Sequence, residues 1–269
     1  MPFARAYSSP AAPSTIQPAA RAARKPPSVF VIGLILAFGI PAAAQEAPPD
    51  LARRVARRET ATRAARDHYT YRQSVAVEEL DGRGAQSGQY REVRDVIFSP
   101  AGERTEQMIG NPVRSLKRLI LTEEDFRDIR EVQPFVMTED QLWNYETRFR
   151  GEEKMDGVDC WVLQVRPRQI LQGQRLFDGM LWVGKQDYSI VRMEGQAVPQ
   201  IYNGKSENLF PRFTTLRRPV DGKHWFPYFT YADDTLPFRT GPQRIRLSIR
   251  YTNYQRFGAE SSVTFETPK

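Results

Sequence analysis

The sequence predicts a mainly β fold of the α+β class, in which about ten or eleven antiparallel strands build one large sheet. Short segments that alternate apolar and polar residues recur along the chain, and they are rich in the β-branched and aromatic side chains that suit a half-buried sheet. Turn dipeptides such as Asp156-Gly157 and Asp178-Gly179 separate several segments, so hairpins can join consecutive strands. A helix near the N-terminus and short helices near the middle interrupt this pattern.

The N-terminal 44 of the 269 residues have the features of a secretory signal peptide. Basic residues within Arg21–Lys25 precede the apolar run Val29–Ile40, which is short for a membrane span, and the small residues Ala42–Ala44 follow. We therefore expect cleavage before Gln45 and export, to the periplasm or otherwise; an uncleaved N-terminal anchor is the alternative. No cysteine occurs in this region, so lipid attachment to a new N-terminal cysteine is not expected.

Beyond residues 1–44 we expect one domain. Residues 45–50 are predicted to be a disordered mature N-terminus and residues 51–269 a single β-rich domain, since such domains often reach about 200–250 residues. The signal peptide holds four of the 39 basic residues and none of the 32 acidic ones, so the net charge beyond it is 35 − 32 = +3 instead of +7. A charge this small gives no support for a nucleic-acid partner.

The N-terminal helix is expected over Leu51–Arg66. Leu51, Val55 and Thr62 lie near one stripe of this helix, and six arginines surround the stripe. The arginines could form a basic face for anionic lipid headgroups. The stripe is poor in large apolar residues, however, which favours a solvated helix that packs one narrow stripe on the sheet.

Strands and short helices follow in the first half of the chain. Strands are expected over His68–Leu80, Tyr90–Phe98 and Glu103–Ile109, and they form a meander with short connections. A threonine followed by three acidic residues predicts the start of a short helix at Glu123–Arg130. A second helical turn is expected near Thr138–Leu142.

Three consecutive strands, Val158–Val165, Gly179–Val183 and Tyr188–Met193, are expected at the centre of the sheet. The first places Trp161 on one face and Cys160 on the other, with apolar neighbours on both faces, so both faces need cover. Cys160 is the only cysteine, which excludes an internal disulfide. Its position within a strand predicts a small buried hydrophobe instead of a nucleophile.

The remaining strands are expected over Leu209–Leu216, Trp225–Tyr231 and Ile245–Tyr251. Gln196–Glu207 is predicted to be a loop, and Asp233–Pro242 a polar loop with two prolines.

Catalytic signatures are scarce in this chain. It has no nucleophile elbow, phosphate-binding loop, zinc-protease motif or dinucleotide fingerprint. The two histidines, His68 and His224, and the single cysteine give little material for a metal site or a cysteine nucleophile. We therefore expect no catalytic residues, no metal and no cofactor.

Apolar faces of several predicted strands should meet if the sheet curls. A concave apolar face could hold a lipid or an acyl chain, or side chains of the short helices could fill it entirely. The expected trough residues are Trp143, Tyr145, Phe149, Leu181, Val183, Ile245, Leu247, Ile249 and Tyr251. Phe126 and Ile129 of the short helix are expected to point into this trough as a lid.

Three stretches of the sequence resemble a known superfamily. Asp156–Pro167 (DGVDCWVLQVRP), Leu181–Glu194 (LWVGKQDYSIVRME) and Arg250–Phe257 (RYTNYQRF) are similar to strands of the LolA-like superfamily of periplasmic lipoprotein carriers and outer-membrane lipoprotein-sorting proteins. The match is a packing pattern over a minor part of the chain. It implies a curved antiparallel half-barrel with a helical lid and a hydrophobic cavity for acyl chains. No single arginine here aligns with the lid-latching arginine of the family.

The expected function is binding of an apolar ligand, namely the acyl chains of a lipid or lipoprotein, without catalysis, for lipoprotein sorting or transport to the outer membrane. An envelope protein that donates or accepts the ligand and transient contact with a membrane surface are the expected partners. The alternative is a periplasmic sensor or protein-interaction module with a filled trough, which binds protein through a loop such as Asp233–Pro242. A third class is an outer-membrane β-barrel, although several strands are shorter than the ~9–11 residues that a membrane strand needs.

Overall fold

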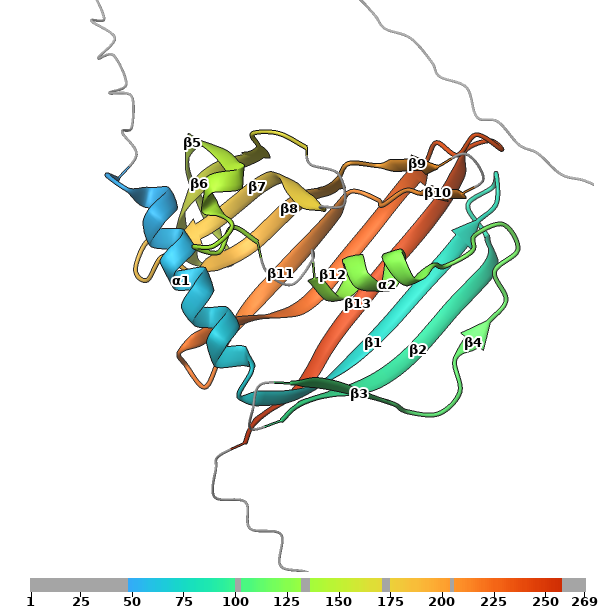
Figure 1. The fold of residues 1–269 in the computed structure, drawn as a ribbon, viewed down its shortest axis with the longest axis horizontal. Helices are drawn as coiled ribbons and strands as arrows, with labels where there is room; N and C mark the ends of the chain where they lie inside the picture. Colours follow the sequence, from blue (N-terminus) through green and yellow to red (C-terminus); the bar gives the residue numbers. More distant parts are fainter. Residues whose placement is uncertain (1–47, 100–102, 132–135, 171–174, 204–205, 258–269) are drawn as a thin grey trace, which may run out of the picture. The chain divides into compact units, whose positions relative to one another are not determined.

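The computed structural model describes residues 48–99, 103–131, 136–170, 175–203 and 206–257 (Figure 1). The predicted signal peptide at 1–44 lies outside the described residues. None of the helices in the described ranges is long and apolar enough to cross a membrane.

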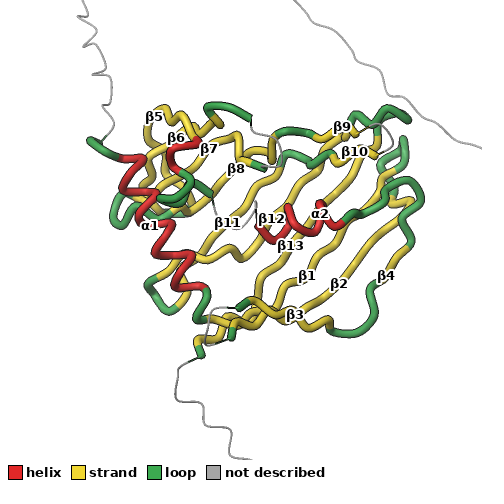
Figure 2. The backbone as a smooth tube through the Cα atoms, in the orientation of Figure 1, coloured by secondary structure: helices red, strands yellow, loops and turns green. Residues whose placement is uncertain are grey.

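One large antiparallel sheet dominates the described part of the chain (Figure 2). This sheet has eleven strands: ten follow the order β3-β2-β1-β13-β12-β11-β8-β7-β6-β5, and β4 pairs with β2. Strands β9 and β10 form a separate small hairpin. The strand bounds are β1 Tyr69–Leu80, β2 Gln86–Phe98, β3 Arg104–Met108, β4 Val113–Arg114, β5 Tyr145–Met155, β6 Val158–Pro167, β7 Leu176–Gly184, β8 Ile190–Val198, β9 Ile201–Asn203, β10 Ser206–Asn208, β11 Phe213–Val220, β12 His224–Leu236 and β13 Gln243–Arg256. The predicted mainly β class and antiparallel half-barrel are confirmed.

The sheet curves, and its edges at β3 and β5 do not meet. Register shifts occur between Phe149 and Gly151 in β5 and between Leu216 and Arg217 in β11. Such bulges bend a strand and increase its twist, which curls the sheet around one face. The helices α1 (Leu51–Arg66) and α2 (Glu123–Glu131) both lie over that concave face (Figure 1).

Alternation along the strands separates the core from the outer surface. In β1, Val75 and Val77 point to the concave side and are buried, and they pair with Ile249 and Leu247 of β13. The intervening residues of β13 are exposed or half-buried. Because the side-chain period of a strand is two, this register places every apolar residue of the pair against the helices.

The three consecutive strands predicted from Val158 to Met193 are present, but they lie toward the β5 edge of the sheet instead of its centre. Strand β7 runs through the predicted turn Asp178-Gly179, and β8 begins at Ile190 instead of Tyr188. Strands β6, β7 and β8 pair antiparallel in chain order. Cys160 is fully buried on the convex face beside Trp182, and burial, with nearby acidic groups, raises the pKa of its thiol to about 11. Arg192 lies 4.7 Å from the centre of the Trp182 ring, and the Trp182 indole donates to Glu153 at 2.7 Å. On this face, the long side chains of Arg192 and Glu153 shield the apolar residues from water.

Three sequence predictions in the second half of the chain are wrong in part. Asp233–Leu236 belongs to β12, because Asp233 accepts hydrogen bonds from Arg244 and Arg246 on the next strand and Leu236 is buried. The strand expected from Leu209 begins instead at Phe213. The predicted loop Gln196–Glu207 contains the end of β8 and most of the small β9–β10 hairpin.

Candidate ligand-binding site

The concave face gathers most of the residues predicted for the trough. One continuous buried core contains six of them, together with the predicted lid residue Ile129: Tyr145, Leu181, Val183, Leu247, Ile249 and Tyr251. Phe149 is half-buried against the same core. The alternation of three separate strands, β5, β7 and β13, therefore converges on one surface, as curling of the sheet requires.

Two predicted trough residues lie elsewhere. Trp143 is in the short 3-10 helix η1 (Leu142–Asn144), before β5 begins, and its side chain is 61% exposed. The strand interpretation fails there because backbone bonds from Gln141 and Leu142 to the carbonyl of Thr138 keep the chain in a turn. Ile245 is buried, but in a neighbouring cluster with Leu236.

The part of the concave face under α1 is filled. Leu51, Val55 and Ala56 of α1 are buried against the core. The ring of Phe177 lies over the paired glycines Gly179 and Gly195, where an added Cβ would collide with it. Glycine at these two positions lets the aromatic ring take the space of two side chains, which fills the concave face beside β7 and β8, where Phe177 also packs on Phe213.

A buried ion pair fastens α1 to the sheet. The guanidinium of Arg217 on β11 donates two hydrogen bonds of 2.7 Å to the Glu59 carboxylate on α1. Both side chains are almost fully buried, and Glu59 also accepts the backbone N–H of Val136 at 3.2 Å. A bidentate pair with a further donor is the geometry that compensates two buried charges.

The part of the concave face near α2 is hollow. A cavity of about 310 Å³ lies between α2, the segment before it and the ends of β12 and β13. Its lining is mainly apolar and comprises Val77, Arg118, Leu119, Ile120, Leu121, Thr122, Asp125, Ile129, Glu207, Leu209, Phe210, Pro211, Leu236, Phe238, Thr240, Ile245 and Leu247. This volume is at the small end of the range for ligand sites, and the apolar lining suits an apolar ligand.

Three of the predicted site residues line this cavity, and the lid residue Phe126 does not. Ile129, Ile245 and Leu247 face the cavity. Phe126 packs on the Tyr90 ring, with 5.7 Å between the ring centres. On a helix, residues three apart share one face only approximately, so the two lid residues contact different parts of the sheet.

Polar contacts hold α2 in place. The carboxylate of Asp125 accepts the backbone N–H of Thr122 at 2.7 Å and the amide of Asn208 at 2.9 Å. The hydroxyl of Thr122 in turn accepts the backbone N–H of Asp125 at 3.3 Å, so Thr122 is the helix cap that the sequence predicts. Asp128 forms an ion pair of 2.8 Å with Arg175. Burial raises the pKa of Asp128 to about 6, against the lowering effect of the Arg175 charge, and burial also raises the pKa of Asp125.

The rim of the cavity is formed by a segment that sequence reasoning missed. The buried carboxylate of Glu79 accepts the backbone N–H groups of Lys117, Arg118 and Leu119 at 2.8, 2.7 and 2.6 Å. Ile120, next along the chain, is 86% exposed. The apolar run from Leu119 to Leu121 has neither strand nor helix periodicity, and this absence was the only signal of an irregular lining segment.

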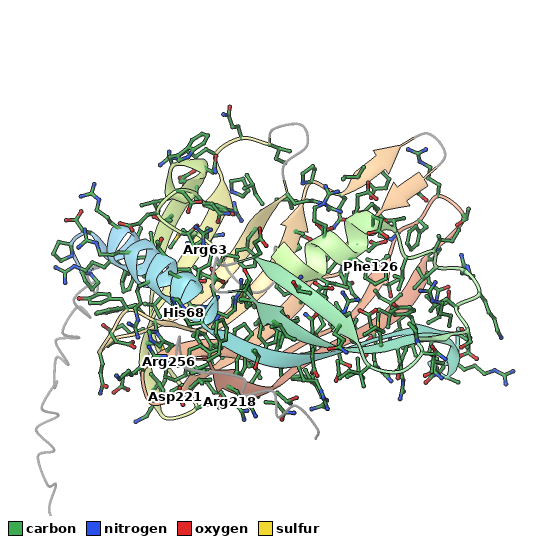
Figure 3. The ribbon with its side chains drawn as sticks, turned by 60° about the horizontal axis from the view of Figure 1, so that its bottom comes forward. Arg63, His68, Phe126, Arg218, Asp221 and Arg256 are labelled. Atoms are coloured by element: carbon green, nitrogen blue, oxygen red, sulfur yellow. The ribbon has the colours of Figure 1, made fainter. Side chains whose placement is uncertain are left out.

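Among the residues described, no set of three or more His, Cys, Asp or Glu side chains could hold a metal ion. His68 lies at the other end of the sheet from Phe126 of α2, near Asp221 and Arg256 (Figure 3). Burial, with the nearby Arg58 charge, lowers the pKa of His224.

Comparison with known proteins finds similarity at the level of solved structures. No family model and no curated protein matches the sequence. A DUF1329 family protein from Desulfovibrio piger is 16% identical with a TM-score of 0.38, and the alignment covers 79% of this chain and 92% of that one. A putative outer membrane lipoprotein-sorting protein domain from Vibrio parahaemolyticus is 13% identical with a TM-score of 0.32 over 77% and 92%. A LolA superfamily protein from Nitrosomonas europaea is 13% identical with a TM-score of 0.32 over 78% and 98%.

These likenesses concern the fold alone. The half-barrel implied by the resemblance of the three sequence stretches is the fold observed.

Proposed function

We propose that this chain is an exported, non-enzymatic protein that binds one apolar chain, such as an acyl chain of a lipid, in the cavity beneath α2. The observation that carries the proposal is the contrast within the concave face, where the same core continues into a hollow lined by apolar side chains. An apolar ligand that enters this hollow would bury its own surface and that of the lining together. The sequence of residues 1–44 supports export.

The cavity volume supports a single chain as the ligand. A volume of about 310 Å³ is at the small end of the range for ligand sites, which favours one chain over several, and a chain of about ten methylenes serves as the example. Burying ten methylenes contributes about 8 kcal/mol, which exceeds the lower estimates of the association cost, about 4 kcal/mol. A lipoprotein with several acyl chains would need α2 to move further from the sheet.

Carriage of the ligand between envelope sites follows as the expected role. The polar contacts of α2 to Asn208 and Arg175 can break and re-form more easily than a packed apolar helix could leave the sheet. Loading and unloading would then use a donor and an acceptor in the envelope, with transient contact at a membrane surface.

A sensor or protein-interaction module is the second candidate. The filled region under α1, with its buried Glu59–Arg217 pair, favours it, because a rigid scaffold needs no ligand. The loop proposed to bind protein is shorter than the sequence suggests, since only the residues after Leu236 leave the strand.

Binding of a fluorescent acyl probe tests the proposal. Delipidated wild-type protein should bind a fluorescent dodecanoyl probe, and native mass spectrometry of protein exported to a periplasm should find a lipid-sized adduct. Leu247→Phe, which fills the cavity without adding charge, should reduce probe binding at least tenfold.

Ile97→Phe provides the matched control. Ile97 is 39% exposed and absent from the cavity lining, so this variant makes the same kind of change outside the site. Thermal unfolding establishes that both variants fold. If wild type binds no probe, or if Leu247→Phe binds as well as Ile97→Phe, the cavity is not the site and the sensor function becomes the better explanation.

A further inference from the structure

Arg118 is the one cationic side chain among the described residues that line the cavity. Its guanidinium lies at the exposed rim and donates to the backbone carbonyls of Thr240, Gly241 and Pro242 at 3.5, 3.2 and 3.3 Å. All three acceptors are neutral carbonyl oxygens. A guanidinium forms stronger hydrogen bonds with an anion than with a neutral carbonyl, so an anionic group at the rim would gain from it.

The backbone at Arg118 is held in place from below. Glu79 has no solvent exposure, and its carboxylate binds three successive N–H groups of residues 117–119. A carboxylate saturated by three donors fixes the peptide planes of the rim, so the side chain of Arg118 starts from a defined position above the cavity.

The two acidic residues of the lining have hydrogen-bond partners of their own. Asp125 accepts hydrogen bonds from Thr122 and Asn208, which occupy both of its oxygens. Glu207 accepts the backbone N–H of Arg239 at 3.2 and 3.1 Å and forms an ion pair with its guanidinium at 3.5 Å. The Glu207 charge is therefore paired with Arg239, while the three hydrogen bonds of Arg118 all go to carbonyl oxygens, so within the described ranges the Arg118 charge has no carboxylate among its hydrogen-bond partners.

We propose that the ligand is a single-chain anionic amphiphile, whose apolar chain enters the cavity and whose carboxylate or phosphate head binds Arg118. This inference rests on the proposed function and adds the head-group class to it. A neutral lipid of the same chain length would fill the cavity equally but would leave the guanidinium with its carbonyl partners alone.

The alternative for Arg118 is a purely structural contact between the two sides of the rim. Its three carbonyl bonds join the segment before α2 to the loop before β13. That role affects stability, and it makes no distinction between charged and neutral ligands. A comparison of head groups therefore separates the two roles.

Displacement of the neutral fluorophore N-phenyl-1-naphthylamine from the delipidated full chain provides the test. Decanol, decanoate and decyl phosphate, at a pH of about 8, compete for the same space with one chain length and three head groups. For each competitor, the concentration that displaces half of the fluorophore is measured. The ratio of this concentration for decanol to that for decanoate should be about fivefold smaller in Arg118→Gln than in wild type. Arg118→Lys, which keeps the charge without the planar fork, should retain part of the preference.

Lys117→Gln is the matched control, since it removes one charge at the neighbouring residue without altering the lining. A ratio that falls in Arg118→Gln and not in Lys117→Gln supports the inference, and a larger fall for decyl phosphate than for decanoate assigns the head as phosphate. Equal ratios in wild type and Arg118→Gln, or equal falls in both variants, overturn it while the cavity function stands. Absence of fluorophore binding and of displacement by decanol overturns both proposals.

Discussion

The two ends of the concave face differ in what covers them, although one sheet supplies both. Under α1, apolar side chains fill the space and a bidentate ion pair between Glu59 and Arg217 lies at the contact. Under α2, the helix contributes few apolar groups and rests on Asp125–Asn208 and Asp128–Arg175, above a cavity of about 310 Å³. The comparison shows that in this protein the helix, more than the strand pattern, decides whether a concave face becomes core or binding site.

The difference follows from the physical chemistry of the two covers. A buried bidentate pair is costly to break, because the remaining charge stays in the interior without its counter-charge. A helix held by single hydrogen bonds and by a carboxylate whose pKa is raised to about 6 is easier to displace. The α1 end is therefore suited to stability and the α2 end to exchange of a ligand.

Breaking the Glu59–Arg217 pair should have the largest effect on stability. Glu59→Ala leaves Arg217 charged and buried, and we expect a loss of about 3–5 kcal/mol in the free energy of unfolding, measured by urea denaturation. Asp128→Ala, which breaks the pair at α2, should cost less, since Arg175 keeps the carbonyl of Pro199 as a partner at 2.6 Å. Equal losses in the two variants would remove the energetic distinction between the ends.

Truncation of a leucine at each end should give the second-largest effect. Leu181 is fully buried in the filled region, so Leu181→Ala should cost about 2–5 kcal/mol. Leu247 borders the existing cavity, where fewer atoms surround it, so Leu247→Ala should fall at or below the lower end of that range. A ligand-free preparation is needed for both measurements, because a bound chain would stabilise the wild type. A larger loss for Leu247→Ala would mean that the α2 end is packed in solution.

The pH dependence of stability should identify Asp128 as part of the α2 fastening. Its folded-state pKa is raised to about 6 from the ordinary value of 3.8, so the folded protein binds this proton more tightly than the unfolded chain does. Its contribution is therefore most favourable below about pH 4 and declines as pH rises to about 6, by about 3 kcal/mol. Asp128→Asn should lack this decline. The measurement is the free energy of unfolding as a function of pH in wild type and variant, and the difference between the two curves gives the contribution of Asp128.

Asp233 on the convex face provides a control of opposite sign. The hydrogen bond from Arg244 lowers its pKa, so its contribution is present above the ordinary value and is lost as pH falls through the lowered one. The wild type should lose a small amount of its free energy of unfolding at acidic pH, and Asp233→Asn should lack this loss. Between pH 4 and 6 the pH dependence of stability should be the same in both proteins. A flat difference curve for Asp128→Asn would show that this carboxyl is solvated.

The strand pattern was predictable from the sequence, and the division of the trough was not. Alternation in segments such as Ile245–Tyr251 specifies which side chains face inward, because a strand has only two faces. Whether that face is filled depends on contacts between distant segments. Glu59 lies in an arginine-rich helix and Arg217 beside Arg218, so both resemble ordinary surface residues until the fold brings them together. Trp143 fits the alternation of the strand after it, but backbone hydrogen bonds to the carbonyl of Thr138 hold the preceding residues in a turn.

The smallest effect on stability is expected at the rim, where Ile120 is 86% exposed. Ile120→Ser should change the free energy of unfolding by no more than about 0.5 kcal/mol, because little apolar surface returns to water. Ile190→Ser is the matched substitution in the filled region, where the side chain is 1% exposed, and it should cost at least about 2 kcal/mol. Thermal and urea unfolding of the delipidated proteins measure both. A loss above about 1 kcal/mol in Ile120→Ser would show that the rim closes over Ile120 in solution, and the α2 end would then resemble the α1 end more than the structure indicates.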